Sequence, residues 1–247
     1  MSKDLNKNLL IAKKAALEAG KFLANYNKRN LKVLQNTGKD IKISADKEAE
    51  KIILDILQKK SDIPILSEEK GFIGKKNDLK WIVDPLDGSF NFFRGIPVTC
   101  VSIGLCLKEK PLIGVIYDFN RNELFFGIAK KEAWLNGKKI SVSKIRNKKD
   151  GVIVVGFPSK TDFSSESLKN FIGCIQDFKK VRLLGSAALS LAYVACGRAD
   201  VYFEKKIMFW DVAAGLAILS GAGGKYTMKK SNIKQAYIIE ASNKKII

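Results

Sequence analysis

The sequence predicts an α+β fold in which sheets and helices form separate layers. Three observations support that prediction. Apolar residues recur at helical spacing near the N-terminus, alternate with a period of two over a long central stretch, and return to helical spacing after it. A long antiparallel meander between helical segments is typical of the α+β class.

Residues 1–150 are expected to form an N-terminal α+β half. The spacing predicts an amphipathic helix over 4–27, a short strand over 41–43, and a second helix that follows Ser44 and Asp46. Either of these side chains can cap the second helix, and we expect Ser44 to do so. Asp46 lies where an extended segment becomes a helix, a position that often faces a site.

Two buried strands come next, and both lead into acidic residues. Residues 64–67 form the first strand and precede Glu68 and Glu69, whereas residues 81–83 form the second and precede Asp84. If these strands are neighbours that end together, Glu68 lies beside the turn that Asp84 begins. Carboxylates gathered at one sheet edge indicate a functional site far more strongly than isolated acids do.

The stretch 99–143 has period-two alternation with tight turns, which indicates an antiparallel meander. Strands are predicted over 101–107, 113–117 and 124–129. The Asn-Gly pair at 136–137 is a strong signal for a hairpin turn. We assign no chemistry to this meander.

Residues 151–247 are expected to form a C-terminal α/β half that completes the same structural unit. Small residues from Gly185 onward lie at a strand-to-helix junction, where a ligand or another helix can approach closely. Asp211 lies in the first turn of a helix, and its local interpretation is a cap. The predicted elements are strand 152–157, helix 165–178, strand 181–184, helix 187–196, strand 201–203 ending at Glu204, helix 209–219, and strands 225–228 and 237–240.

Composition limits the chemistry available to the 247-residue chain. It contains no histidine, which excludes His-ligated zinc sites, Ser-His-Asp triads and phosphohistidine chemistry. Its four cysteines have no metal-binding spacing, and we expect them to be small buried residues in a reducing compartment. The N-terminus lacks the apolar run of a signal peptide, and no uncharged apolar run reaches membrane-spanning length. We therefore expect a cytoplasmic protein with no membrane partner.

The formal net charge of +19 raises the question of a nucleic-acid partner. The excess is mostly lysine, dispersed along the whole chain, and no aromatic-plus-basic motif of the RNA-binding type accompanies it. We interpret it as charge on solvated faces, which disfavours a nucleic-acid partner but leaves that role open.

Residues 81–93 are the chemical centre of the sequence. The segment D-P-L-D-G-S at 84–89 brings two carboxylates and the Leu86 carbonyl into one small volume. Like charges this close require a cation, and a set made only of oxygens suits a hard one. Gly88 and Ser89 can present N–H groups to an anion where the next helical turn begins. The segment predicts a metal-assisted phosphate site, with an ordinary turn or a structural calcium loop as alternatives.

Taken together, these residues resemble the inositol monophosphatase superfamily of Mg²⁺-dependent, lithium-sensitive sugar-phosphate phosphatases. The family's central motif stands here as D-P-L-D-G-S-F-N-F at 84–92, its glutamate pair as L-S-E-E at 66–69, and its second motif as W-D-V-A-A-G at 210–215. The resemblance covers nearly the whole chain. It implies the layered α-β-α-β-α sandwich of the inositol monophosphatase and fructose-1,6-bisphosphatase type.

The resemblance also implies roles for individual residues. It implies a metal-activated water that attacks phosphorus in line, with Ser89 holding the water and Asp46 linked to a more loosely held metal. Lys39 falls in a loop that covers the site in this family. Two or three Mg²⁺ ions would be bound by Glu68, Asp84, the Leu86 carbonyl, Asp87 and Asp211. The phosphate would be held by the N–H groups of Gly88 and Ser89, and the hydroxyls of the sugar or cyclitol by Gly185, Ser186, Ala187 and Glu204.

Within the superfamily, the segment N-F-F-R-G-I-P at 91–97 favours inositol monophosphatases and dual inositol monophosphatase/fructose-1,6-bisphosphatases. We expect a Mg²⁺-dependent phosphomonoesterase that acts on an inositol-1-phosphate-like substrate. Fructose-1,6-bisphosphatase and 3′(2′),5′-bisphosphate nucleotidase activities are alternatives. Another is an RNA- or transcription-associated binding protein on the same fold, which the charge favours and the intact acidic set opposes. The resemblance further implies a homodimer.

Overall fold

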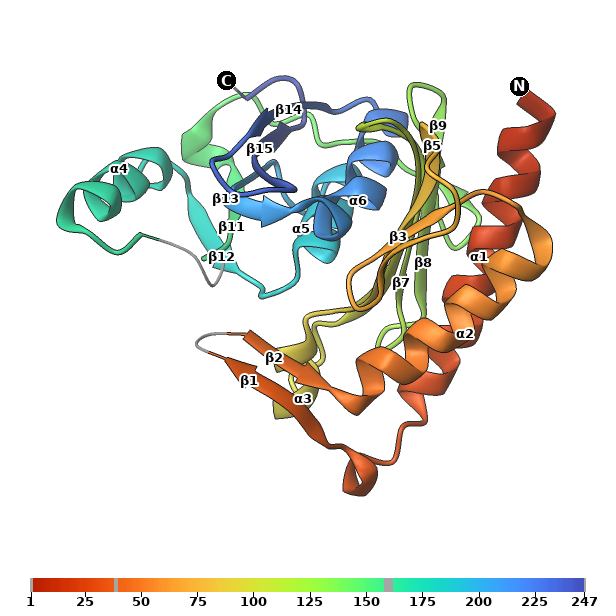
Figure 1. The fold of residues 1–247 in the computed structure, drawn as a ribbon. Coiled ribbons are helices and arrows are strands. Elements are labelled where there is room, and N and C mark those ends of the chain that lie inside the picture. The colour runs from red at the N-terminus through yellow and green to blue at the C-terminus, as the bar shows by residue number, and fades with distance from the viewer. Residues whose placement is uncertain (1, 38–39, 158–161, 247) are drawn as a thin grey trace.

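The computed structural model describes residues 2–37, 40–157 and 162–246, so the expectation for Lys39 lies outside the described residues. Five layers are stacked in the order helices, sheet, helices, sheet, helix (Figure 1). The predicted α+β class and its α-β-α-β-α layering are confirmed. No helix in the described ranges is both long enough and apolar enough to span a bilayer.

The first layer consists of α1 (Ser2–Ala24) and α2 (Ser44–Lys60), which pack on each other and on the large sheet. Between them, β1 (Val33–Thr37) and β2 (Asp40–Ile43) form a separate hairpin. The large sheet has eight strands in the order β10-β9-β8-β7-β6-β5-β3-β4. Its strands are β3 (Ile65–Ser67), β4 (Gly71–Ile73), β5 (Leu79–Asp87), β6 (Cys100–Leu107), β7 (Lys110–Asp118), β8 (Glu123–Ile128), β9 (Glu132–Leu135) and β10 (Lys138–Lys139).

The small sheet has five strands in the order β12-β11-β13-β15-β14. Helices α5 and α6 lie between the two sheets, and α4 covers the outer face of the small one (Figure 1). The remaining elements are α3 (Ser89–Arg94), β11 (Val152–Val155), α4 (Ser165–Ile175), β12 (Lys180–Leu183), α5 (Ala187–Ala195), β13 (Val201–Met208), α6 (Phe209–Gly221), β14 (Lys225–Lys230), β15 (Ala236–Ser242), and single 3₁₀ turns at Lys28–Asn30 and Lys148–Asp150.

Each space between layers is filled by an apolar core. One core lies between the first two helices and the large sheet and contains Trp81 and Ile103. A second core surrounds α5 and α6 and reaches both sheets, with Phe125 on one side and Tyr202 on the other. A third, smaller core lies under α4. Every described strand of the large sheet precedes residue 151 and every strand of the small sheet follows it. The division into halves 1–150 and 151–247 stays a prediction.

Three sequence expectations about local structure are corrected. Ser44 does not cap α2, because its hydroxyl contacts the Tyr26 hydroxyl and accepts from the Lys32 N–H, and the Asp46 carboxylate accepts from the Ile43 N–H instead. The strand expected to end at Glu204 continues to residue 208 through a bulge. The cysteines are not all buried, since Cys174 is exposed and Cys196 is only partly covered. Strands β1 and β4 were not predicted.

A pair of glycines lets α6 lie against the large sheet. Gly104 and Gly114 face each other across β6 and β7. A Cβ atom on Gly114 would lie 2.0 Å from the Ala214 carbonyl oxygen, and one on Gly104 would lie 3.2 Å from the Ala214 nitrogen. The backbone of α6 therefore touches the strands directly, and this contact places the first turn of α6 beside the end of β5.

We expect Gly114→Ala to destabilise the protein by about 1–3 kcal/mol, because a methyl group there overlaps the α6 backbone. Gly173→Ala is the matched control. Gly173 lies within exposed helix α4 with nothing near its missing Cβ, so this change should stabilise by up to about 1 kcal/mol. Urea denaturation of both variants measures the difference, and equal stability of the two would contradict the close α6 contact.

Candidate active site

The first two acids of the site, Glu68 and Asp84, follow paired residues of two parallel strands. Strands β3 and β5 pair in parallel, with Ser67 opposite Val83, so Glu68 and Asp84 leave the sheet side by side. The Glu68 N–H donates to the Val83 carbonyl over 3.1 Å. The predicted adjacency of these strand ends is confirmed. It depends on where each buried strand ends, which the sequence indicated, and on the pairing of β3 with β5, which the structure shows.

The turn after Asp84 is built from local hydrogen bonds. The Asp84 carboxylate accepts from the Leu86 N–H over 3.0 Å, within an irregular stretch where β5 separates from β6. Gly88 has φ +89°, and a Cβ there would lie 2.9 Å from the Val98 carbonyl, so the position requires glycine. The Ser89 hydroxyl lies 2.9 Å from the Leu86 carbonyl oxygen. The turn thus holds its carbonyl and hydroxyl oxygens close together.

The Asp87 carboxylate joins the two halves of the chain. It accepts hydrogen bonds from the Ser186 hydroxyl and from the Ala188 N–H, the latter over 2.8 Å, and the Cys100 thiol lies 3.7 Å away. Ser186 also caps α5 by accepting from the Leu189 N–H. An acid at the end of β5 is therefore held at the N-terminus of a helix from the second half, which places Gly185, Ser186 and Ala187 at the same site.

Asp46 and Asp211 each combine a helix cap with a place at the site. One Asp46 oxygen accepts from the Ile43 N–H and the other lies 2.8 Å from the Ser89 hydroxyl. One Asp211 oxygen accepts from the Met208 N–H over 3.1 Å at the start of α6. Asp211 also lines a cavity that it shares with Glu68 and Asp84. The local cap interpretation of Asp211 is correct, and the side chain reaches the site as well.

These residues surround one cavity of about 260 Å³. Except for Asp46, which lies behind Ser89, the predicted site residues all line it. Seven further residues, which the sequence did not single out as site residues, also line it: Ile41, Phe90, Val155, Gly156, Phe157, Ser190 and Ile207. Its predicted lining residues are Glu68, Asp84, Leu86, Asp87, Gly88, Ser89, Gly185, Ser186, Ala187, Glu204 and Asp211.

The cavity wall is strongly acidic. Withdrawal from water raises the pKa of Asp84 and of Asp211 well above the ordinary range, and repulsion from Glu68 raises both further. Burial, with the charges of Asp46 and Glu69, raises the pKa of Glu68 to about 8. Burial likewise raises the pKa of Asp46 to about 6. The described residues that line the cavity include no lysine or arginine, and Lys42, which pairs with Glu69 outside it, offsets only part of the repulsion.

The donor set fits a hard divalent cation. Four carboxylates and one carbonyl provide only oxygen atoms, the ligands that Mg²⁺ prefers. Protein groups hold one oxygen each of Asp84, Asp87 and Asp211, and no three acids, cysteines or histidines among the described residues surround a single ion position. The remaining oxygens of the four acids would have to turn toward a shared cation.

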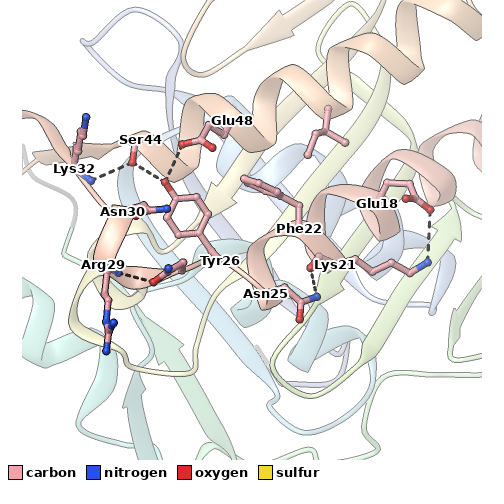
Figure 2. Close-up of a pocket in the computed structure, with 12 residues that line it drawn as sticks. Glu18, Lys21, Phe22, Asn25, Tyr26, Arg29, Asn30, Lys32, Ser44 and Glu48 are labelled. Atoms are coloured by element: carbon pink, nitrogen blue, oxygen red, sulfur yellow. Dashed lines mark hydrogen bonds and ion pairs between the residues drawn. The ribbon is translucent and has the colours of Figure 1, made fainter.

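A larger cavity of about 1030 Å³ lies near the beginning of α2 and contains none of the predicted site residues (Figure 2). Its wall carries the Tyr26 hydroxyl, which lies 2.8 Å from both the Ser44 hydroxyl and the Glu48 carboxylate. The Lys32 N–H donates to the same Ser44 oxygen over 3.1 Å. These bonds fix the first turn of α2, which also bears Asp46. The residues around this cavity therefore help to hold the helix turn that carries Asp46. We place the chemistry in the smaller, acidic cavity.

Comparison with known proteins gives a consistent result. The model of the Inositol monophosphatase family matches residues 4–246. The Nus factor SuhB of Pasteurella multocida is 39% identical over 225 residues, which cover 89% of this chain and 84% of that protein. The inositol-1-monophosphatase of Synechocystis is 39% identical over 227 residues, covering 90% and 78%.

Solved structures agree with these sequence matches. The inositol monophosphatase from Anabaena superposes with a TM-score of 0.85 at 37% identity, over 98% of this chain and 92% of that one. The extragenic suppressor protein suhB from Bartonella henselae gives a TM-score of 0.87 at 36% identity, over 95% and 93%.

The raised pKa values predict that the metal-free protein loses stability as the pH rises. Between the ordinary carboxyl pKa and the raised one, the folded state binds more protons than the unfolded state, so unfolding becomes easier as the pH increases. We expect the Tm in excess EDTA to fall by about 5–10 °C between pH 5 and pH 8, since 1 kcal/mol is worth about 2–4 °C at this size.

The control for this measurement is Asp211→Asn, which removes one of the repelling charges and should flatten the dependence. A Tm in EDTA that rises over the same pH range would contradict the proposed repulsion.

Proposed function

The chain belongs to the inositol monophosphatase family, and from this premise we propose that it is a Mg²⁺-dependent phosphatase of a small sugar or cyclitol monophosphate. The observation that supports the proposal best is the cavity itself. Four acids from β3, β5 and α6 meet there with no described cation among them, beside an N–H-rich turn. An acidic wall of this kind requires bound metal before an anionic phosphate can enter.

We propose that Glu68, Asp84, Asp87, Asp211 and the Leu86 carbonyl would hold two or three Mg²⁺ ions. When bound, these ions supply a water of lowered pKa and neutralise charge on the phosphoryl oxygens. Family membership supports this proposal, because the D-P-L-D-G-S and W-D-V-A-A-G segments that carry these acids resemble the family's motifs. The finer assignment of each acid stays a proposal.

The remaining roles belong to polar groups of the protein. Ser89 has one hydroxyl proton and two neighbouring acceptors, Asp46 and the Leu86 carbonyl, so its oxygen lone pairs are available to orient a water molecule. Asp46, with its pKa raised to about 6 by burial, accepts from the Ser89 hydroxyl and can take up that proton as Ser89 takes one from the water. Gly88 and Ser89 line the same cavity, and their N–H groups are proposed to hold the phosphate.

The cavity lining favours a monophosphate over the bisphosphate alternatives. A second phosphate would need its own cations, and the described lining offers neither lysine nor arginine. Lys205, the lysine next to Glu204, is exposed and places its ammonium group 5.8 Å from the centre of the Phe203 ring. The polar groups on this side of the cavity, Ser186 and Glu204, instead suit hydroxyl groups of a leaving alcohol.

A binding role in the transcription machinery is the second candidate. Several relatives are named Nus factor SuhB, and the net charge of +19 is compatible with an RNA partner. An active enzyme that also binds RNA is consistent with both observations. From the family resemblance we further propose a cytoplasmic homodimer, which a monomer mass in light scattering would contradict.

With Mg²⁺, the protein should release phosphate from inositol 1-phosphate at least about 100-fold more efficiently than from fructose 1,6-bisphosphate or 3′-phosphoadenosine 5′-phosphate. This preference in kcat/KM corresponds to about 2.7 kcal/mol in the transition state. Phosphate release at equal substrate concentration measures it. Preference for either bisphosphate would replace the monophosphate proposal with the corresponding alternative.

Asp84→Asn is the active-site variant for this assay, and Asp55→Asn, on an exposed position of α2, is its matched control. The first should abolish turnover while the protein remains folded, and the second should leave it unchanged. Retained turnover by Asp84→Asn at saturating Mg²⁺ would contradict the assigned site.

If the chain also binds RNA through its dispersed positive charge, a column of immobilised RNA should retain it at low salt and release it as salt rises. Asp84→Asn should be retained as strongly as the unaltered protein, because the acidic cavity is not the RNA-binding surface. Elution with the void volume at low salt would remove this candidate.

A further inference from the structure

The Glu204 carboxylate is held by a tyrosine from its own strand. Tyr202 and Glu204 are two residues apart on β13, so their side chains leave the strand on the same face. The Tyr202 hydroxyl donates to Glu204 Oε2 over 2.7 Å. Tyr202 is 0% exposed and packs in the central core, so its hydroxyl cannot swing away from this acceptor. The tyrosine is a fixed donor.

Gly156, beside the neighbouring strand, packs against the same carboxylate. It follows β11, which pairs in parallel with β13. A Cβ atom on Gly156 would lie 2.3 Å from Glu204 Oε2 and 2.4 Å from Glu204 Oε1. The carboxylate therefore lies flat against the glycine backbone, in space that any other residue would occupy. A methyl group at this position would have to displace the carboxylate.

These two contacts leave one carboxylate oxygen of Glu204 without a donor among the described residues. Glu204 Oε2 is taken up by Tyr202, whereas Oε1 accepts no hydrogen bond from any described residue, and the side chain lines the catalytic cavity. A carboxylate oxygen with no donor of its own is a strong acceptor for a hydroxyl group. Its direction is set by Tyr202 and Gly156 together.

We propose that Tyr202 and Gly156 are positioning residues that aim Glu204 at a hydroxyl of the leaving alcohol, and so select polyhydroxylated leaving groups. The inference rests on the proposed phosphatase function and deepens it. Neither residue touches the reacting phosphate. Both act on the reaction through the orientation of one acceptor, so they should influence only those substrates that offer it a hydroxyl.

The test compares two substrates in Tyr202→Phe. We expect kcat/KM for inositol 1-phosphate to fall about tenfold, mainly through a higher KM, because a misaimed acceptor loses contact with the ring hydroxyl. For phenyl phosphate, whose leaving group carries no additional hydroxyl, kcat/KM should stay within about twofold. The ratio of the two values is the readout, since general damage to the fold lowers both.

Tyr117→Phe is the matched control. Tyr117 is also buried, at 6% exposure, and its hydroxyl lies 2.9 Å from a single side-chain oxygen, that of Asn122, at the end of β7. This variant loses the same kind of bond away from the cavity, and its substrate ratio should equal that of the unaltered protein. An equal loss of ratio in both tyrosine variants would overturn the inference.

Gly156→Ala tests the second contact independently and should lower the same ratio, because the added methyl group displaces Glu204. In a Glu204→Ala background, Tyr202→Phe should cause no further loss of ratio, since the acceptor it positions is absent. Additional loss in that background would assign Tyr202 another role and overturn the inference.

The outcomes also separate this inference from the proposed function. If the unaltered protein hydrolyses inositol 1-phosphate and Tyr202→Phe keeps its substrate ratio, the positioning role fails and the phosphatase proposal stands. If the unaltered protein neither hydrolyses inositol 1-phosphate nor binds it in calorimetry with Mg²⁺, the proposed substrate class fails, and the selection inferred from it fails too.

Discussion

Repulsion among buried acids is the constraint on which the rest of the structure depends. Glu68, Asp84, Asp87 and Asp211 reach one cavity from a pair of parallel strands and a helix N-terminus, and each has a raised pKa. Packing between the layers withdraws these acids from bulk water, and this raises the cost of their charges. The fold tolerates the site because rigid elements hold the acids in place. Hydrogen bonds to the backbone satisfy one oxygen of each of the three aspartates.

The rigidity of the site comes from contacts that cross the chain. Asp87 accepts from Ser186 and Ala188, about a hundred residues later in the sequence, so the end of β5 and the start of α5 cannot move apart without breaking a buried network. The backbone of α6 lies against Gly114. This contact places Asp211, in the first turn of α6, beside the end of β5. The two halves are therefore coupled through the site, and a change in either should affect the acids of the cavity.

Local patterns in the sequence predict the helices, the meander and the acidic ends of β3 and β5, because buried strands and the residues after them are visible in one dimension. That β3 and β5 are neighbours is shown by their parallel pairing in the structure. The hairpin strand β1 was missed because V-L-Q-N-T is short and mostly polar. Ser44 was taken for a cap because capping depends on which side chain turns back, and its hydroxyl instead contacts Tyr26. The pairs formed by Asp87 with Ser186, and by Glu204 with Gly156, depend on how distant strands pack, which no local spacing reports.

The arrangement separates the chemistry from the choice of substrate. The acids proposed to hold metal come mostly from the first half, around β3 and β5, and the groups proposed to face the leaving alcohol come from the second, around β11, α5 and β13. The second group includes Glu204, whose carboxylate contacts Tyr202 and Gly156, and neither of these two residues is among the acids proposed to hold metal. Substitutions there can change which alcohol is accepted while the acidic cluster stays intact. Because of this separation, an intact acidic set is evidence for hydrolysis but identifies the leaving group poorly, and the orientation of Glu204 is the more informative feature.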